Sequence, residues 1–258
     1  MKHISSRDNP LYKQLRQLLS SAAQRKRAGA MVLEGVHLAQ AWLAAGGEAQ
    51  QCVMAEEGFA DAEIAQLLER IPGECVAVLP EALYRGLSLL DQGASMLLLA
   101  DQPAAEMPAR IAQDCVILDR VQDAGNAGSI LRTAAAAGVE LALCVAGTSS
   151  AWSPKTLRAG MGAHFRMQVV EGLDAPGVLE RLDVRLLAAA PCAAQTIFQT
   201  DLRAPAAWVF GNEGQGLDPA WLDAAQGLAI PQTERIESLN VAAVAAICLF
   251  ETRRQRLA

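Results

Sequence analysis

From Cys115 to the C-terminus, short apolar segments alternate with segments of helical spacing, and this alternation constrains the fold more than any other feature of the chain. The apolar segments include "CVILD", "LALCVAG" and "AAWVFG", while "AGSILRTAAAAG" is typical of the helical segments. Parallel strands need long crossovers, which are usually helices. The pattern therefore predicts an α/β domain with a mostly parallel sheet that helices cover on both faces.

A first block of similar pattern precedes this domain and ends near residue 100. Its strand candidates, "AMVLEG", "QCVMA" and "CVAVL", alternate with helix candidates such as "VHLAQAWLAAG" and "DAEIAQLLERI". Residues 101–114 contain two prolines and several alanines, which is typical of a linker. The chain has 258 residues, 52% of them hydrophobic, enough for two cores. We predict a smaller N-terminal α/β domain over 1–100, a linker over 101–114 and a larger domain over 115–258.

Positive charge is concentrated at the N-terminus of a chain whose net charge is −6. Residues 1–27 contain seven Lys and Arg residues against one Asp, so this arm carries +6 and the remainder about −12. A basic arm on an acidic body suggests a polyanion such as RNA as partner, but a solvated helix face has the same composition. The spacing of "KQLRQLL" indicates a short helix, with Tyr12 beside Lys13 and Arg16 as a stacking surface.

Secretion and membrane insertion are not indicated. The start "MKHISSRDNPLYK" lacks an apolar stretch of signal-peptide type, and no apolar run reaches the roughly 18 residues of a membrane span. We therefore expect a soluble, cytoplasmic protein. The six cysteines are not paired at metal-ligand spacing and several lie in apolar runs, which favours buried free thiols over a disulfide framework or a zinc site.

Three strand candidates of the second block are followed by polar loops. In "LDRVQDAGNAGSILRTA", the first turns of a helix carry Asn126 and Arg132, which are six residues apart, so that both are expected at one side of the strand's carboxyl end. Ligands of open α/β sheets bind outside those ends. The simpler interpretation, in which Asn126 caps the helix and Arg132 pairs on the surface, remains open.

The second polar loop is "WVFGNEGQGLD", in which Gly211, Gly214 and Gly216 flank Asn212 and Glu213. Glycines permit positive φ and a close approach of the backbone to a ligand. The glycine order differs from Gly-x-Gly-x-x-Gly, and the loop comes late in the domain. A dinucleotide-binding loop of the dehydrogenase type is therefore only weakly indicated.

The third polar loop, "IPQTERIESLN", leads into the Ala-rich segment 239–250, which we interpret as a buried helix. Glu237, Ser238 and Asn240 stand at its entrance, either as ordinary caps or as ligand-binding groups. The three loops contain no histidine, no nucleophile–His pair and no Gly-Lys-Ser. Hydrolysis and P-loop chemistry are therefore disfavoured, and a neutral, amide-rich ligand such as a nucleoside is favoured.

Taken in order, these loops resemble the three signature motifs of the SpoU (TrmH) family, the RNA ribose 2′-O-methyltransferases of the SPOUT superfamily. The matching residues are Asn126-x-Gly128-x-x-x-Arg132, then Gly211-Asn212-Glu213-Gly214-x-Gly216-Leu217, then Ile230-Pro231 and Ser238-Leu239-Asn240-Val241. Upstream, "MVLEGVHLAQAWLAAG" is similar to a ribosomal-protein-like substrate-binding domain of the family. The segment "HISSRDNPLYKQLRQLL" resembles the basic start of its rRNA-modifying branch.

The resemblance implies a domain whose C-terminal part forms a trefoil knot, with S-adenosylmethionine held in a bent shape by the second and third loops. It also implies a homodimer through this domain and RNA as substrate, rRNA rather than tRNA. The implied cofactor-binding residues are Gly211, Gly216, Ile230 and Leu239. The implied catalytic residues are Arg132, Asn126, Glu213, Ser238 and Asn240. Arg132 would orient the ribose hydroxyl and stabilise the developing alkoxide, and the other four would position it and the ribose.

Four positions depart from the family pattern: Ala127, Gln232, Glu234 and Ala242. Glu234 adds a negative charge near the cofactor or the RNA phosphates. Three alternatives stay open: a tRNA 2′-O-methyltransferase, a non-catalytic RNA-binding protein with this fold, and a dehydrogenase-like nucleotide enzyme. The last needs a glycine fingerprint at its first strand with an acidic residue about 20 positions later, and the chain has no such pair.

Overall fold

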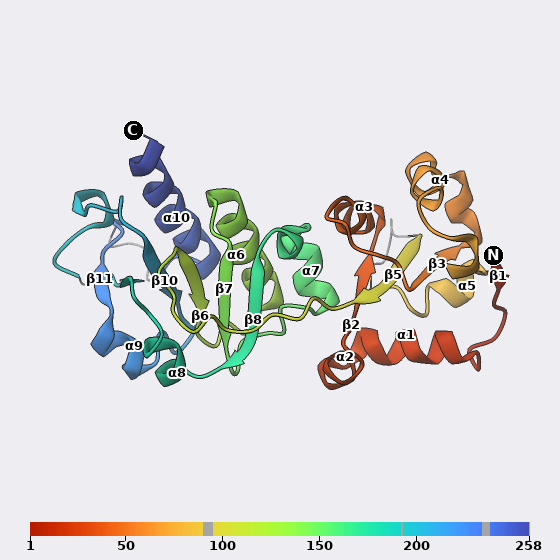
Figure 1. Cartoon of the computed structure of the whole chain (residues 1–258), viewed down its shortest axis with the longest axis horizontal. Helices are drawn as coiled ribbons and strands as arrows, with labels where there is room; N and C mark the ends of the chain where they lie inside the picture. Colours follow the sequence, from red (N-terminus) through yellow and green to blue (C-terminus); the bar gives the residue numbers. More distant parts are fainter. Residues whose placement is uncertain (90–94, 192, 234–237, 258) are drawn as a thin grey trace. The chain divides into compact units, whose positions relative to one another are not determined.

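The computed structural model describes residues 1–89, 95–191, 193–233 and 238–257. Cys192, Glu234 and Glu237 lie outside these ranges. The chain divides into two compact units, which are drawn in Figure 1. The first unit comprises Met1–Ala104 and Trp152–Phe165, and the second comprises Ala105–Ala151 and Arg166–Ala258. The segment Trp152–Phe165 lies in the second block of the sequence but packs with the first unit.

The first unit is built on a five-stranded sheet of order β1-β4-β3-β5-β2. Its strands are β1 (Lys2–His3), β2 (Ala30–Glu34), β3 (Gln51–Ala55), β4 (Val76–Leu79) and β5 (Met96–Asp101). Strand β5 runs antiparallel to β2 and β3, and the other pairs are parallel. The three apolar runs predicted as strands are β2, β3 and β4, and they are almost wholly buried.

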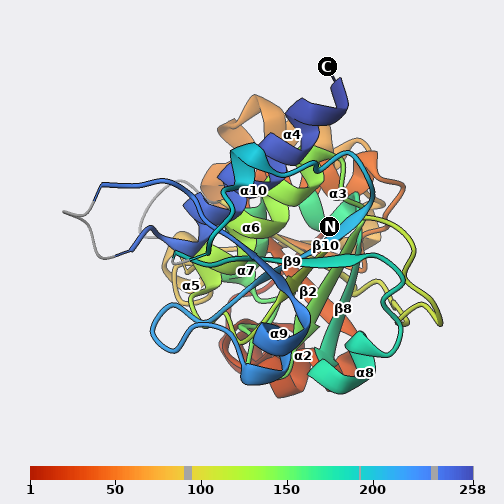
Figure 2. The same cartoon turned by 90° about the vertical axis from the view of Figure 1, so that its left-hand side faces the viewer.

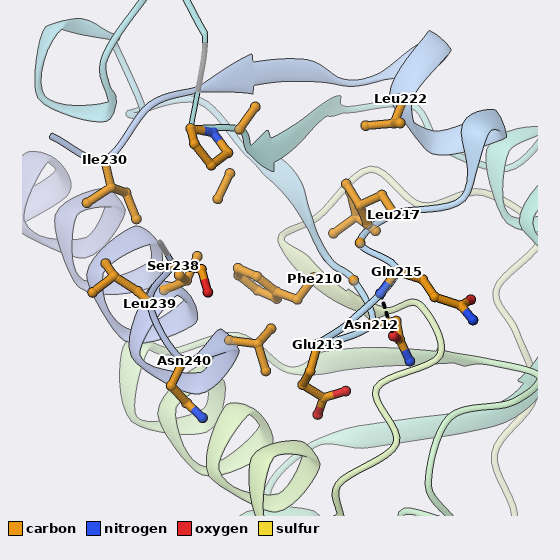
Figure 3. A pocket seen from close by; sticks show the side chains of 18 of the residues that line it. Phe210, Asn212, Glu213, Gln215, Leu217, Leu222, Ile230, Ser238, Leu239 and Asn240 are labelled. Atoms are coloured by element: carbon orange, nitrogen blue, oxygen red, sulfur yellow. Dashed lines mark hydrogen bonds between the residues drawn. The ribbon is translucent and has the colours of Figure 1, made fainter. Parts of the chain in front are cut away.

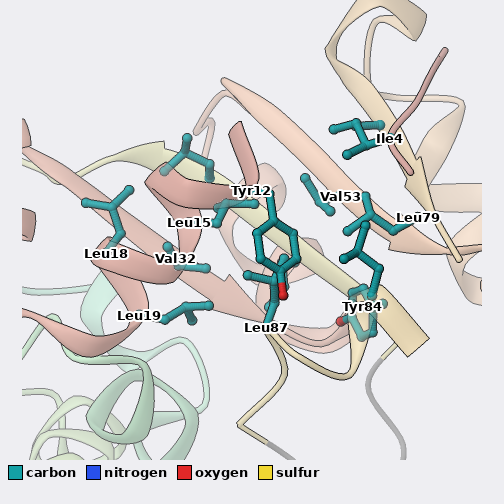
Figure 4. Close-up of a cluster of buried hydrophobic side chains, with 14 of the residues drawn as sticks. Ile4, Tyr12, Leu15, Leu18, Leu19, Val32, Val53, Leu79, Tyr84 and Leu87 are labelled. Carbon is teal, nitrogen blue, oxygen red and sulfur yellow. The ribbon is translucent and has the colours of Figure 1, made fainter. Parts of the chain in front are cut away.

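The basic arm forms two helices, α1 (Pro10–Ser20) and α2 (Ala22–Ala28). The Asn9 side chain caps α1. The apolar side of this helix packs on the sheet (Figure 4). Tyr12 and Leu15 are 2% and 0% exposed, because residues three apart share one helix face and that face is buried. The expected stacking surface at Tyr12 is therefore wrong: the apolar side of α1 is part of the core, Arg25 is buried, and the other Lys and Arg residues of the arm are exposed.

Further helices complete the first unit: α3 (Val36–Ala44), α4 (Ala62–Leu68), α5 (Glu81–Tyr84) and α7 (Pro154–Gly160). Helix α7 contacts β2, where Arg158 forms an ion pair of 3.3 Å with the fully buried carboxylate of Glu34. Phe165, at the end of the same segment, makes an edge contact with Trp42 of α3. These contacts explain why residues 152–165 belong to the first unit.

The second unit contains a six-stranded sheet of order β11-β9-β10-β6-β7-β8, and all of its strand pairs are parallel. The strands are β6 (Cys115–Leu118), β7 (Leu141–Val145), β8 (Gln168–Leu173), β9 (Arg185–Ala189), β10 (Ala206–Phe210) and β11 (Gln226–Leu228). The predicted parallel α/β sheet is thus confirmed for this unit.

Helices cover both faces of this sheet (Figures 1 and 2). One face carries α6 (Ala124–Ala137) and α10 (Val241–Leu257), and the other carries α8 (Ala175–Leu179) and α9 (Pro219–Ala224). Trp208 of β10 donates from its indole to Thr252 of α10, while Trp221 of α9 joins the core cluster on the opposite face. The final helix begins at Val241, two residues after the start of the predicted apolar segment, and it runs to Leu257.

Cys52, Cys115, Cys144 and Cys248 are free and buried, as predicted. Burial raises the pKa of Cys52 and Cys115 to about 12, so these thiols stay protonated at neutral pH. Within the described ranges, no helix combines the length and apolar composition that a bilayer span needs.

Candidate active site

A cavity of about 550 Å³ opens at the carboxyl ends of β9, β10 and β11. Residues 189–191 line it after β9, parts of 209–217 line it at the end of β10, and parts of 230–232 and 238–244 line it beyond β11. Figure 3 shows Ile230 and Leu239 on one side of the cavity and Leu217 and Leu222 on the other. Its size and mostly apolar walls are those of a small-molecule site.

The cavity lies beside the point where the strand order reverses. From β6 the chain adds β7 and β8 on one side, and β10, β9 and β11 lie on the other. The loops after β6 and β10 therefore leave the sheet in opposite directions, and ligands of open α/β sheets bind in the resulting crevice. The three polar loops of the sequence meet at this edge.

The loop after β10, residues 211–217, is closed by its own hydrogen bonds, and we call it the glycine loop. Asn212 and Gly216 exchange main-chain hydrogen bonds of 3.1 and 2.9 Å, and the Asn212 carboxamide oxygen accepts from Gly214 and Gln215. A Cβ at Gly211 would lie 2.7 Å from the main chain of Gly216, so a side chain there would displace the loop. Gly216 has φ +71°, which favours glycine.

Three side chains from the three loops form one hydrogen-bonded chain. Asn240 Nδ2 donates to Asn126 Oδ1 at 3.0 Å, and Asn126 Nδ2 donates to Glu213 Oε1 at 2.9 Å. The main-chain N–H groups of Gln122 and Asp123 also donate to Glu213, both at 3.3 Å. Because every contact has a defined donor, the orientation of the Asn126 amide is set by its neighbours.

Glu213 is held as a carboxylate. Burial alone raises its pKa, but the hydrogen bonds from Asn126 and from main-chain N–H groups outweigh burial and leave the pKa below its ordinary value. With several donors directed at an ionised group, Glu213 is suited to hold Asn126 in place and unsuited to remove a proton from a substrate.

Helix caps answer two questions that the sequence left open. Asp123, and not Asn126, caps α6, because the Asp123 side chain accepts from the main-chain N–H of Asn126. Asn240 is both a helix cap and a residue of the site. Its Oδ1 accepts from the main-chain N–H groups of Ala242 and Ala243 at the start of α10, and its Nδ2 donates to Asn126. One side-chain amide thus caps a helix and joins the site.

Arg132 stands apart from this group. Its side chain is exposed on α6, it does not line the cavity, and no hydrogen bond or ion pair joins it to another residue in the described part of the chain. Six residues on an α-helix turn a side chain by about 240° relative to the first. Asn126 and Arg132 therefore leave the helix in directions about 120° apart, so their spacing alone does not bring the two side chains together. The expectation that both reach one side of the strand end stays a prediction.

The other residues predicted for the site fall into two groups. Asn126 lies next to the cavity through its bonds to Glu213 and Asn240. The residues that line the cavity itself are Gly211, Glu213, Gly216, Ile230, Ser238, Leu239 and Asn240. Gln232, one of the departures from the family pattern, lines it as well.

Asp119 and Arg120 were not predicted from the sequence. Asp119 is fully buried at the end of β6 and forms an ion pair with Arg120 at 3.0 Å. Arg120 has φ +55°, which is rare for a residue other than glycine. The signal in the sequence was an acidic residue at the end of the apolar run "CVILD", but the main-chain N–H of Asp218 that donates to it lies 99 positions away.

Comparison with known proteins agrees with the geometry of the site. The model of the SpoU rRNA Methylase family matches residues 114–250. An uncharacterized tRNA/rRNA methyltransferase of Synechocystis sp. is 36% identical over 99% of this chain and 94% of its own length. A 23S rRNA (guanosine(2553)-2′-O)-methyltransferase of Bacillus subtilis is 29% identical over 98% of this chain and 100% of its own. The crystal structure of an AdoMet-bound rRNA methyltransferase from Sinorhizobium meliloti superposes with a TM-score of 0.83 at 28% identity, covering 100% of this chain and 99% of that one.

Proposed function

The chain belongs to the SpoU rRNA methylase family, and we propose that it transfers a methyl group from S-adenosylmethionine to a ribose 2′-hydroxyl of rRNA. One observation carries the proposal: Asn126, Glu213 and Asn240, one from each motif loop, are hydrogen-bonded at the wall of a cavity of cofactor size. When bound, S-adenosylmethionine supplies a methyl group on a sulfonium that a nucleophilic oxygen can attack.

The residues of the cavity fit this cofactor. Apolar side chains on two sides suit the faces of an adenine ring and the methylene groups, and a few polar groups remain to fix orientation. Because Gly211 and Gly216 have no side chain, their main chain is available to the ligand. We assign cofactor binding to Gly211, Gly216, Ile230 and Leu239, with the chain around them threaded as a trefoil knot.

For the chemical step, we assign the preparation of the ribose to residues of this chain. Glu213 fixes the Asn126 amide, Asn240 fixes its carbonyl, and Ser238 offers a hydroxyl on the same cavity wall. Arg132 is exposed and unpaired in the described ranges, so an RNA strand can reach it. We propose that Arg132 orients the 2′-hydroxyl and stabilises the negative charge that develops on its oxygen as the proton passes to solvent water.

RNA docking is assigned to the outer side of α1 and α2. Lys13, Arg16, Lys26 and Arg27 are exposed there, while the apolar side of α1 is buried. Lys13 pairs with Asp8, which leaves the other three cations for phosphate contacts. The rest of the chain is acidic and repels a polyanion, so the arm should dominate electrostatic attraction. The named relatives favour rRNA over tRNA as the substrate.

We also propose a homodimer through the second unit. Helix α10 exposes Phe250 at 47% and Leu257 at 74%, and the nearby short helix Ile197–Gln199 exposes Phe198 at 56%. Large apolar side chains gathered near one helix are typical of an interface. A second copy of the chain would cover them.

The function is tested by mapping 2′-O-methylation in total RNA from cells with and without the protein, together with methyl transfer from labelled S-adenosylmethionine in vitro. We expect one rRNA nucleotide to lose its methyl group when the protein is absent. Loss of a tRNA methyl group would favour the tRNA alternative. Cofactor binding without transfer to any RNA would identify a non-catalytic RNA-binding protein.

A further inference from the structure

Asp119 and Arg120 form a paired unit at the carboxyl end of β6. The Asp119 side chain is fully buried, and its two oxygens accept from Arg120 Nε and Nη2 at 3.0 and 3.1 Å. A buried carboxylate is tolerated only when its oxygens are paired, and a bidentate guanidinium is the strongest partner available. The side-chain position of Arg120 is therefore tied to the sheet.

Both residues also contact the chain at the two ends of the glycine loop. The main-chain carbonyl of Arg120 accepts from Asn212 Nδ2 at 2.9 Å, near the start of the loop. Asp119 Oδ2 accepts from the main-chain N–H of Asp218 at 2.8 Å, directly after the end of the loop. Asn212 in turn closes the loop from inside by accepting from Gly214 and Gln215.

The backbone of Arg120 is held in an unfavourable conformation by its surroundings. Its φ of +55° lies in the left-handed region, and its N–H donates to Thr148 Oγ1 at 3.1 Å. Thr148 Oγ1 donates to the carbonyl of Leu118 at 2.9 Å, so the turn is anchored to β6. Disfavoured backbone of this kind persists where several contacts over-determine it, and such places cluster at functional sites.

Neither residue lines the cavity, but the loop that they hold does. Gly211, Asn212, Glu213, Gln215 and Gly216 all contribute to its wall. Movement of this loop would change the shape of the cavity and would also move Glu213 away from Asn126. Asp119 and Arg120 thus affect the shape of the cavity through the loop, without lining the cavity themselves.

We infer that Asp119 and Arg120 are positioning residues that hold the glycine loop in the conformation that shapes the cofactor cavity. They act through Asn212 and the main chain of Asp218, without touching the ligand. The identity of that ligand rests on the proposed function, whereas the restraint on the loop does not.

The test uses the full chain with Arg120→Gly, which removes the guanidinium but permits the same backbone conformation because glycine tolerates positive φ. The matched control is Arg203→Gly, since Arg203 forms a similar bidentate pair with Asp201 on the surface of the same unit, away from the cavity. Arg120→Lys keeps the positive charge but cannot form two parallel hydrogen bonds with Asp119, so it should restore part of the restraint on the loop. Hydrogen exchange of the free protein over residues 211–218 and titration with S-adenosylmethionine are the two readouts.

For Arg120→Gly we expect faster exchange confined to residues 211–218. We also expect a Kd for S-adenosylmethionine raised about tenfold, the lower end of what the loss of charge-assisted hydrogen bonds costs. The KM for the cofactor should rise in parallel, while kcat at saturating cofactor stays close to the wild-type value. Arg203→Gly should match the wild type, and Arg120→Lys should fall between.

Two results would overturn the inference. Wild-type exchange and affinity in Arg120→Gly would show that the pair does not restrain the loop. Exchange that rises across the whole second unit would show that the pair only stabilises the fold. If the wild-type protein does not bind S-adenosylmethionine, the proposed function fails, but the exchange comparison still decides whether the pair holds the loop.

Discussion

Asn240 Nδ2 donates a hydrogen bond of 3.0 Å to Asn126 Oδ1, joining residues that are 114 positions apart in the chain. This hydrogen bond connects the cap of α10 to the first turns of α6. Through Asn126 it continues to Glu213, so one chain of side-chain hydrogen bonds joins the three polar loops. A substitution at Asn240 should therefore change the position of the Asn126 amide and its hydrogen bond to Glu213.

Asn240→Asp separates the two roles of this residue. Aspartate still caps α10 with one oxygen, but it places an acceptor opposite Asn126 Oδ1 where a donor is needed. We expect methyl transfer to fall about tenfold or more, since a hydrogen bond of roughly 1.5 kcal/mol is replaced by repulsion. Single-turnover kinetics measure the rate, and urea unfolding measures the stability that is lost with the same hydrogen bond. Asn240→Ala is the comparison, because it also loses the cap and should cost about 1 kcal/mol.

Arg132→Ala tests the assignment of the catalytic cation. The side chain is exposed and makes no described hydrogen bond or ion pair, so the fold and the affinity for S-adenosylmethionine should not change. Methyl transfer should fall at least about a hundredfold, the lower limit for a positioned catalytic group. Arg203→Ala, at an exposed arginine of the same unit, should retain full activity. A wild-type rate for Arg132→Ala would remove Arg132 from the mechanism.

Glu213→Gln should change how stability depends on pH. The pKa of Glu213 is lowered in the folded protein, so below its ordinary value of 4.5 the unfolded chain takes up the proton first. Its contribution to stability is therefore complete above that pH and is lost as the pH falls through the lowered folded-state pKa. Urea unfolding from pH 7 to pH 3 should show wild type more stable than Glu213→Gln at pH 7, with the difference shrinking in acid.

The control for this experiment is Glu180→Gln, which changes an exposed glutamate that follows α8 in the same unit. It should track the wild-type curve across the whole range. A constant difference between wild type and Glu213→Gln would mean that the carboxylate is not favoured by its hydrogen bonds.

Neutralising the outer cations of the arm tests RNA docking. Deletion of residues 1–27 is unsuitable, because Leu15 and Leu18 belong to the core of the first unit. A triple variant should weaken RNA binding; it combines Arg16→Gln, Lys26→Gln and Arg27→Gln. The slope of the logarithm of the binding constant against the logarithm of the salt concentration should fall by about 0.7 to 0.9 for each phosphate that is no longer neutralised. Affinity measured at several salt concentrations gives the slope. Neutralising Arg110 and Arg203 in the second unit should leave the slope unchanged, and an unchanged slope in the arm variant would locate RNA binding elsewhere.

Phe250→Glu tests the homodimer. The chain has a mass of 27.3 kDa, and light scattering of the wild type at micromolar concentration should give about twice that value. A charge at this half-exposed position of α10 should give the monomer mass, because burying an unpaired carboxylate in an interface is costly. Leu222→Glu, at a similarly exposed leucine of α9, should remain dimeric. A wild-type protein at the mass of one chain would rule out the dimer.

Sequence alone determined the strand and helix elements and the meeting of three polar loops. Alternating apolar and helical segments predicted the parallel sheet, because such strands need helical crossovers. Loops at the carboxyl ends of parallel strands share one edge of the sheet, which predicted a ligand site there. The resemblance of the loops to the SpoU motifs implied that Glu213, Ser238 and Asn240 belong to that site, and they line one cavity. The strand pattern follows from local periodicity, which a sequence records directly.

Only the tertiary structure decided which side each polar residue faces. Charge predicted an exposed arm, but its first helix turns Tyr12 into the core, and Arg25 of its second helix is buried as well. The spacing of Asn126 and Arg132 did not show that Asn126 contacts Glu213 while Arg132 is exposed to solvent. Helix orientation depends on packing against the sheet, which residue spacing does not record.

Long-range pairing was likewise beyond the sequence. Asp119 and Arg120 gain their partners Asp218 and Asn212, 99 and 92 positions away, only because β10 pairs with β6. Residues 152–165 pack with the first unit because Arg158 finds the buried carboxylate of Glu34, 124 positions earlier. Buried charges must be paired wherever a partner is available, and the identity of that partner depends on the completed fold.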